Sequence, residues 1–281
     1  MAEISAKDIA ALRKQTGAGM LDCRTALQET GGDIEAAKDW LRTKGLAGAA
    51  KRAGREAQDG AVEVTVEGSV GAIVELNCET DFVAKGAEFR ALVASLTKIV
   101  AEQGDDDLES RPYEGGTVGE AVKQLGATLG ENVGIGRVAR IESADGIVDG
   151  YKHVQNERGT VGVLVELAGV DAGDAKAREV AHDIALHIAS AAPRFVGRDD
   201  VPKDEVERER AVLEAQTREE GKPEQAWPKI VEGKLNGFFK TVTLLEQPFV
   251  KDNKQTIDAL VKTLGPNAGV RRFARVKIGE E

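Results

Sequence analysis

The chain has 281 residues, of which 41% are hydrophobic and 31% charged, and its formal net charge is −10. This balance fits a globular protein of two or three domains and argues against a nucleic-acid-binding face as its main feature. No stretch approaches the roughly 18 apolar residues of a membrane span, and no basic-then-apolar leader opens the sequence. We therefore expect a cytoplasmic protein, in which the two cysteines, Cys23 and Cys78, are small buried side chains.

Residues 1–45 predict a module of three short helices. Ser5 is suited to cap the first helix, Gly17 and Gly19 allow the turn that follows, and Asp33 is suited to cap the third. The glycine-rich turn has neither the preceding strand nor the Gly-Lys-Ser/Thr sequence of a phosphate-binding loop, so we interpret it as a packing feature.

A basic linker is predicted at residues 46–60. The stretch from Arg42 to Arg55 contains five basic residues and no acidic one. We interpret it as a solvated extension of the third helix, with RNA binding as a minor alternative, because the chain as a whole is acidic.

Residues 61–142 predict the first unit of an α+β core. Val62, Val64 and Val66 alternate with polar residues, a pattern typical of a half-buried strand, and residues 68–69 form a two-residue hairpin turn. The elements expected after this turn are a strand at 70–77, helices at about 87–102 and 118–129, and a strand at 133–141.

Two pairs of similar segments indicate that this unit occurs twice. GAIVEL, which starts at Gly71, matches GVLVEL at Gly162, an offset of 91 residues. GENVGIGRVARI, which starts at Gly130, matches GPNAGVRRFARV at Gly265, an offset of 135 residues. The second copy therefore holds 44 additional residues, and we assign it residues 143–200 and 240–281.

The additional residues predict a helical hairpin at 201–239, which we call the arm. Two charged helices, with Val206 and Leu213 inward on the first, are separated by the helix-breaking residues 221–223. Because the arm is charged on most sides, we expect it to project from the core. Two interpretations of its purpose stay open: an insertion without a task, or a surface that contacts a partner.

The segment NCETDFVAK, residues 77–85, places an apolar ring beside a carboxylate just after the first-copy strand. At the offset of 91, Asp81 and Phe82 correspond to Ala172 and Gly173, so the second copy folds without either side chain. A feature present in one copy only is better explained by binding than by folding. The alternative is that Phe82 packs under the hairpin as local core, as most Phe side chains do.

No signature of enzyme chemistry accompanies these elements. His182 and His187 are five residues apart, which is not the i, i+4 spacing of a helical metal-binding pair. The sequence contains no nucleophile elbow, P-loop or paired-carboxylate pattern. We predict a binding protein that is not an enzyme, with no catalytic residue, no metal and no cofactor.

Several long segments resemble the bacterial translation elongation factor Ts family. LRKQTGAGMLDCRTAL, residues 12–27, resembles its amino-terminal signature, and ELNCETDFVAK, residues 75–85, resembles its second. GVLVEL, HIASAAPRF and EQPFVKD follow in the order of the family, so the similarity spans nearly the whole chain. Family members often carry a further carboxy-terminal helical module, whose contacts we expect to be absent or replaced here.

The resemblance implies a guanine nucleotide exchange factor that binds elongation factor Tu, both GDP-bound and nucleotide-free, without itself binding nucleotide. It implies that Phe82 is a wedge beside the partner's magnesium site and that Asp81 disturbs the metal's surroundings. The partner-binding residues that it implies are Thr80, Asp81, Phe82 and Val83 at this site, Arg13, Met20 and Leu21 in the amino-terminal module, and His153 in the second copy.

The fold expected from residues and resemblance together is α+β. It begins with a three-helix module similar to ubiquitin-associated domains, continues as a duplicated core of antiparallel sheet plus helices, and has the arm inserted in the second copy. Two alternative functions stay open: a scaffold that uses the module without promoting exchange, and an RNA-binding protein that uses the module and the basic linker.

Overall fold

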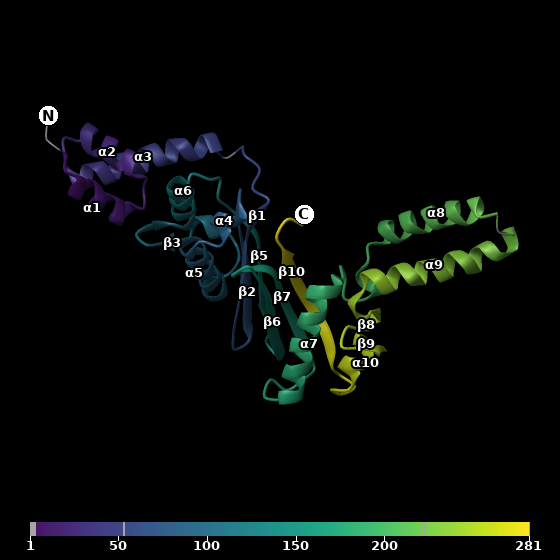
Figure 1. Cartoon of the computed structure of the whole chain (residues 1–281). Coiled ribbons are helices and arrows are strands. Elements are labelled where there is room, and N and C mark those ends of the chain that lie inside the picture. The colour runs from purple at the N-terminus through teal and green to yellow at the C-terminus, as the bar shows by residue number, and fades with distance from the viewer. Residues whose placement is uncertain (1–3, 53, 222, 281) are drawn as a thin grey trace.

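Three helices form the amino-terminal module in the computed structural model, which describes residues 4–52, 54–221 and 223–280, apart from the side chains of 46–51 (Figure 1). Ser5 and Asp8 form a capping box at the start of the first helix, which ends at Gly17 with φ of 65°. A small core that includes Leu12 and Leu27 joins the helices. The predicted module is confirmed; its helices are α1 (Ala6–Thr16), α2 (Met20–Glu29) and α3 (Ile34–Arg52).

The helix α3 does not end at Gly45 but continues to Arg52, so the interpretation of the basic stretch as a helix extension is confirmed. The glycine serves close packing instead. A Cβ added to Gly45 would lie 2.8 Å from the Cβ of Ala127 on α6 (Val118–Leu129). The absence of a side chain at Gly45 thus lets α3 pack closely on α6, and this contact joins the module to the core.

The first copy of the repeat is a three-stranded antiparallel sheet with helices on one face. The first two strands form the predicted hairpin, with Gly68 in the left-handed region at φ of 62°. Phe89 and Leu96 are fully buried where α5 packs on the sheet beside α6. The predicted order is confirmed, with β1 (Asp59–Glu67), β2 (Val70–Cys78), α5 (Ala87–Gln103), α6 and β5 (Gly134–Glu142).

The second copy has the same arrangement, with the strand order β6-β7-β10 in place of β1-β2-β5. Its last strand spans the residues that the offset of 135 assigns to it from β5. The sequence did not place β6, because its first residues are covered on both sides and do not alternate: Ile147 faces the helices and Val148 faces the other sheet. The elements are β6 (Gly146–Gln155), β7 (Arg158–Ala168), α7 (Ala175–Ala191) and β10 (Gly269–Lys277).

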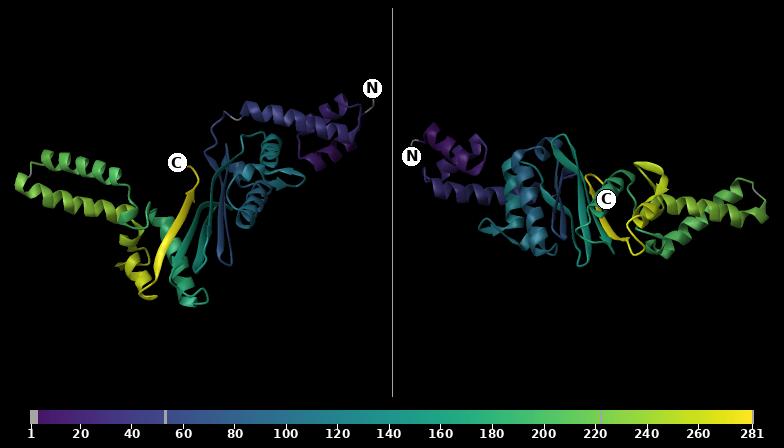
Figure 2. Two further views of the ribbon diagram at one scale, coloured as in Figure 1. Left: turned by 180° about the vertical axis from the view of Figure 1, so that it is seen from behind. Right: turned by 90° about the horizontal axis from the view of Figure 1, so that it is seen from below.

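The two sheets stack face to face, so the core has four layers with helices outside both sheets (Figure 2). Two glycines that are equivalent at the offset of 91 allow this close approach. A Cβ added to Gly71 would lie 2.6 Å from a methyl carbon of Leu164, and one added to Gly162 would lie 2.5 Å from a methyl carbon of Val62. The glycine that begins GAIVEL and GVLVEL is therefore explained by sheet packing.

Two buried carboxylates, also equivalent in the repeat, join the halves of the core. Glu75 is 3% exposed and accepts a hydrogen bond from Arg137 Nε at 2.8 Å. Glu166 is fully buried and accepts from Arg272 Nε at 2.7 Å. Each arginine also donates to a main-chain carbonyl on the last strand of the other copy, which for Arg137 is in β10 and for Arg272 in β5. The halves are thus linked by reciprocal contacts.

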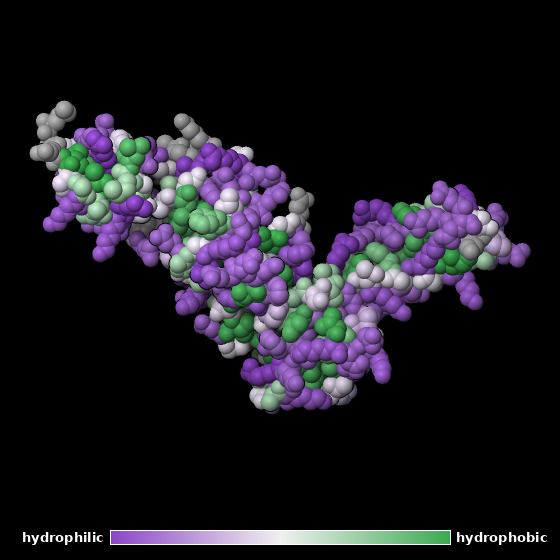
Figure 3. All heavy atoms as spheres, in the orientation of Figure 1, coloured by the Kyte–Doolittle hydropathy of each residue, from purple (hydrophilic) through white to green (hydrophobic). Residues whose placement is uncertain are grey.

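The arm projects from the core as two antiparallel helices, α8 (Lys203–Glu219) and α9 (Trp227–Val242), as predicted (Figures 1 and 2). Leu213 and Leu235 are buried between the helices. Hydrophilic residues cover most of the visible face of the arm (Figure 3).

None of the helices in the described part of the chain has the length and apolar composition of a membrane span.

The other described elements are short. They are α4 (Asp81–Ala84), β3 (Pro112–Tyr113), β4 (Gly116–Thr117), β8 (Pro248–Phe249), β9 (Asp252–Thr256), α10 (Ile257–Lys262), and 3-10 turns at Leu108–Ser110, Arg198–Asp200, Glu224–Ala226 and Leu244–Glu246.

Candidate functional site

The residues after β2 form a single helical turn, α4, and we call residues 80–83 the tip. Thr80 caps this turn, because its hydroxyl accepts a hydrogen bond from the main-chain N–H of Val83 at 3.4 Å. Successive side chains in a helix point in directions about 100° apart, so the turn divides its residues between two sides. Val83 and Ala84 enter the first-copy core, with 7% and 0% exposed.

Phe82 lies on the opposite side of the turn and is 82% exposed. This is the largest exposed fraction among the exposed large hydrophobic side chains of the described residues. The interpretation of Phe82 as local core is therefore wrong. Its neighbours supply the anchor, and the ring itself contributes nothing to the hydrophobic core.

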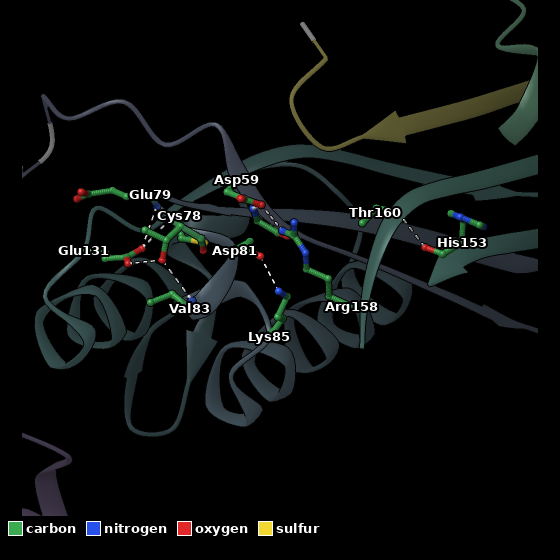
Figure 4. A network of polar contacts seen from close by, with 12 residues as sticks. Asp59, Cys78, Glu79, Asp81, Val83, Lys85, Glu131, His153, Arg158 and Thr160 are labelled. Carbon is green, nitrogen blue, oxygen red and sulfur yellow. Dashed lines mark hydrogen bonds and ion pairs between the residues drawn. The ribbon is translucent and has the colours of Figure 1, made fainter. Parts of the chain in front are cut away.

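Asp81 forms an ion pair with Lys85 one helical turn along the chain, with 2.5 Å between Oδ2 and Nζ (Figure 4). The hydrogen bond and the positive charge of Lys85 hold the pKa of the Asp81 carboxyl below its ordinary value, and the charge of Arg158 on β7 acts in the same direction. The carboxylate is therefore ionised at neutral pH, and about half of its side chain, 53%, is exposed.

The base of the tip is held by Glu131, which lies in the turn between α6 and β5 (Figure 4). Its Oε2 accepts hydrogen bonds from the main-chain N–H groups of Glu79 and Thr80 at 3.0 and 3.1 Å, and its Oε1 accepts from the Thr80 hydroxyl at 2.6 Å. Reasoning from sequence missed Glu131. One signal was available, because Glu131 corresponds to Pro266 at the offset of 135.

Cys78 completes the buried side of this base. Its thiol is fully buried and donates to the carbonyl of Thr80 at 3.2 Å. Burial, together with the nearby negative charge of Glu131, raises the pKa of the Cys78 thiol to about 12. The predicted burial of both cysteines is confirmed, and both are free thiols.

The residues implied in the amino-terminal module lie on the surface. Arg13 is exposed on α1, and Met20 and Leu21, at the start of α2, are 46% and 75% exposed. Hydrophobic residues gather on the visible face of this module (Figure 3). The module and the tip are separate surface regions of the molecule (Figure 1).

His153 is exposed on β6, with Nδ1 3.2 Å from the Tyr151 hydroxyl. It lies near the turn that connects β6 to β7. Arg158, the first residue of β7, forms an ion pair with Asp59 at the start of β1. This end of the second sheet therefore adjoins the end of the first sheet that carries the tip (Figure 4).

The described residues include no group of three or more His, Cys, Asp or Glu side chains placed to hold a metal ion. What the site offers is an exposed ring and an ionised carboxylate, side by side on a base that is fixed by buried neighbours and hydrogen bonds. Such an arrangement can insert into a cleft of another macromolecule at a small cost in conformational entropy.

Fold and site together define an α+β protein with a duplicated core and an exposed tip on its first copy. The family model described as Elongation factor TS matches residues 79–280. Proteins called Elongation factor Ts from Micrococcus luteus and Thermobifida fusca are each 48% identical to this chain, over 99% and 100% of it and 100% of the relative in both cases. One from Aquifex aeolicus is 42% identical over 98% of both chains. The chain belongs to the elongation factor Ts family of translation elongation factors.

Proposed function

We propose that this chain binds elongation factor Tu, in both its GDP-bound and its nucleotide-free form, and promotes the release of GDP so that GTP can load. Family membership supports the choice of partner. The observation that carries the mechanism is the 82% exposure of Phe82 on a turn whose next two residues are buried. The proposed site of action is the cytoplasm.

An exchange factor needs no covalent chemistry, only a difference in affinity. It must bind the nucleotide-free partner more tightly than the GDP-bound partner, and GDP then weakens the protein complex by the same factor. Insertion of the Phe82 ring into a cleft that opens only without nucleotide would contribute about 1.5–3 kcal/mol. That corresponds to a change in affinity of about 10- to 100-fold.

The carboxylate of Asp81 acts on the partner's magnesium site in this proposal. In the free chain it is paired with Lys85 and ionised. Placed beside bound magnesium and phosphates, a carboxylate is repelled by the phosphate charge and competes for the water shell of the ion. Both effects weaken the hold of the partner on GDP.

The remaining implied residues have two kinds of role. Arg13, Met20, Leu21 and His153 are exposed and would add contact area away from the nucleotide. Thr80 is exposed and would contact the partner as well as cap the tip, whereas Val83 is buried and would act as its core anchor. A contact between the arm and the partner stays a prediction.

The ion pairs of the basic stretch favour exchange over RNA binding. Lys44 Nζ lies 3.1 Å from Asp22 Oδ1, and a guanidinium nitrogen of Arg55 lies 3.4 Å from Glu79 Oε1. Cations that are already paired attract phosphate less strongly. The protein-binding proposal needs no such attraction.

Stopped-flow fluorescence tests the proposal directly. Elongation factor Tu loaded with a fluorescent GDP analogue is mixed with increasing concentrations of the chain, and the release rate should rise and then saturate. Excess GDP should in turn dissociate the complex with nucleotide-free partner. An unchanged release rate contradicts the proposal; binding without acceleration would favour the scaffold, and RNA affinity with a steep salt dependence would favour the RNA-binding alternative.

A further inference from the structure

We propose that Glu131 is a positioning residue for nucleotide exchange: its carboxylate holds the tip in the geometry in which Phe82 enters the partner. This inference rests on the proposed function and extends it to a residue outside the tip. Glu131 makes three hydrogen bonds, of 2.6 to 3.1 Å, to the two residues that precede Asp81.

The tip needs such support because it is short. The helix α4 has four residues, Asp81–Ala84, and an isolated helical turn of that length is not stable in water. Val83 and Ala84 fix its inner side. The main chain that leads into the turn is exposed to solvent at Thr80, and Glu131 is the side chain that binds both N–H groups there.

The second copy shows that the repeat does not require this carboxylate. Glu131 corresponds to Pro266, whose side chain accepts no hydrogen bond. Cys78 corresponds to Gly169, where an added Cβ would lie 2.0 Å from the carbonyl oxygen of Asn267. The second copy thus closes the same junction by direct packing of its main chain. Glu131 and the tip therefore occur together in the first copy, and the second copy lacks both.

The neighbours of Glu131 fasten the base of the tip on its other side. The carboxylate of Glu79 accepts from the main-chain N–H of Asn132 at 2.6 Å and lies 3.4 Å from Arg55. The side-chain amide of Asn132 donates to the carbonyl of Arg55 at 2.7 Å. The network therefore joins the tip, the turn after α6 and the segment that leads out of the amino-terminal module.

The role makes different predictions for two substitutions of Glu131. Glu131→Ala removes all three bonds, and we expect stimulated GDP release to fall by about 5- to 10-fold. Glu131→Gln keeps an oxygen for the two N–H groups, and its amide nitrogen can donate to the Thr80 hydroxyl, so its rate should stay near wild type. Glu102→Ala, which removes an exposed carboxylate on α5, is the matched control and should not change the rate.

A double-mutant cycle with Phe82→Ala tests whether Glu131 acts through the ring. If it does, adding Glu131→Ala to Phe82→Ala should slow GDP release little further, because the effects of residues that act as a unit are not additive. Deficits that multiply would overturn the inference. So would a wild-type rate in Glu131→Ala, or an equal loss in Glu131→Ala and Glu131→Gln.

Hydrogen exchange separates this inference from the proposed function, because it needs no partner. The amides of Glu79 and Thr80 should lose protection from hydrogen exchange in Glu131→Ala and keep it in Glu131→Gln. Unchanged protection in both variants overturns the positioning role, even if the chain accelerates GDP release. If wild type fails to accelerate GDP release, the proposed function fails whatever the amides do. Should Glu131→Ala not fold, Glu131→Asp carries the test, because it keeps the charge but draws the carboxylate back from Glu79 and Thr80 by one methylene group. Both amides should then lose protection and release should slow, and full protection of both amides in Glu131→Asp overturns the positioning role.

Discussion

The two copies of the repeat share their packing and differ where the middle strand ends. Both copies keep a glycine at the sheet interface, Gly71 and Gly162, and a buried carboxylate, Glu75 and Glu166. After β7 the second copy passes to α7, which Asp174 caps directly. After β2 the first copy inserts the turn α4 and exposes a Phe ring to solvent.

This difference separates the residues that stabilise the fold from the residues that we propose to act on the partner. The shared residues lie between or within the layers of the core, so replacing them should lower the free energy of unfolding. Asp81 and Phe82 lie outside those layers, so their loss should be felt in partner binding and nucleotide release. Each of the following experiments tests one side of this division.

The largest expected effect concerns the shared buried carboxylates. Glu166 lies 2.7 Å from both Arg271 and Arg272, so Glu166→Gln should lower the free energy of unfolding by about 2–3 kcal/mol. Among the described residues, Glu75 pairs with Arg137 alone, and Glu75→Gln should cost less. Denaturant unfolding at pH 7 measures both. Equal stability of Glu166→Gln and wild type would show that the equivalent pairs are not needed by the fold.

The stability difference for Glu166 should depend on pH. Burial acts to raise the pKa of this carboxyl, but hydrogen bonds from Arg272 and Arg271 outweigh it and the pKa lies below its ordinary value. A group with a lowered pKa stabilises the fold fully above its unfolded value, about 4.3 for Glu, and loses that contribution as the pH falls through the folded value. The gap between wild type and Glu166→Gln should therefore narrow below about pH 4.

The fold was largely predictable because its signals are local or repeated. Ser5, Gly17 and Gly68 mark ends and turns through their own chemistry, and the offset of 135 transfers the limits of β5 to β10. β6 was not predicted, because both faces are covered at its first residues and the period of two is lost there. The close approach of Gly45 to Ala127, which packs the module against the core, was not predicted, because the local sequence does not indicate which distant residue a helix will meet.

The exposed residues of the site could be predicted from the sequence, but the hydrogen bonds that hold them in place could not. Asp81 and Phe82 stood out because the second copy lacks them. The bonds from Glu131 join residues more than 50 positions apart, and no local pattern indicates which carboxylate will meet which N–H group. Comparison of GENVG with GPNAG would have singled out Glu131, but only once the junction at the tip was known.

A smaller effect is expected for the carboxylate of the tip. Asp81→Asn keeps the shape and removes the charge, so stimulated GDP release should slow by about 5- to 10-fold with magnesium present and by less after chelation with EDTA. Asp145→Asn is a matched control, because Asp145 is an exposed carboxylate paired with Arg271 away from the tip. A deficit of the same size with and without EDTA would contradict the magnesium role.

The smallest effect is expected in the amino-terminal module. Met20 is 46% exposed, and Met20→Ala should weaken binding to elongation factor Tu by about 2- to 5-fold through lost apolar contact. Because α2, which begins at Met20, lies away from α4 (Figure 1), the concentration needed for half-maximal release should rise while the maximal rate stays the same. A lower maximal rate at unchanged half-saturation would show that the module takes part in nucleotide release itself.

The most direct test measures stability and exchange on one variant, Phe82→Ala, beside Val66→Ala, which shortens an exposed side chain at the opposite end of β1. We predict that Phe82→Ala unfolds like wild type and slows stimulated GDP release by about 10- to 100-fold, whereas Val66→Ala releases GDP like wild type. A wild-type release rate in Phe82→Ala, or a loss of about 3–5 kcal/mol of stability as for a buried Phe, would contradict the account.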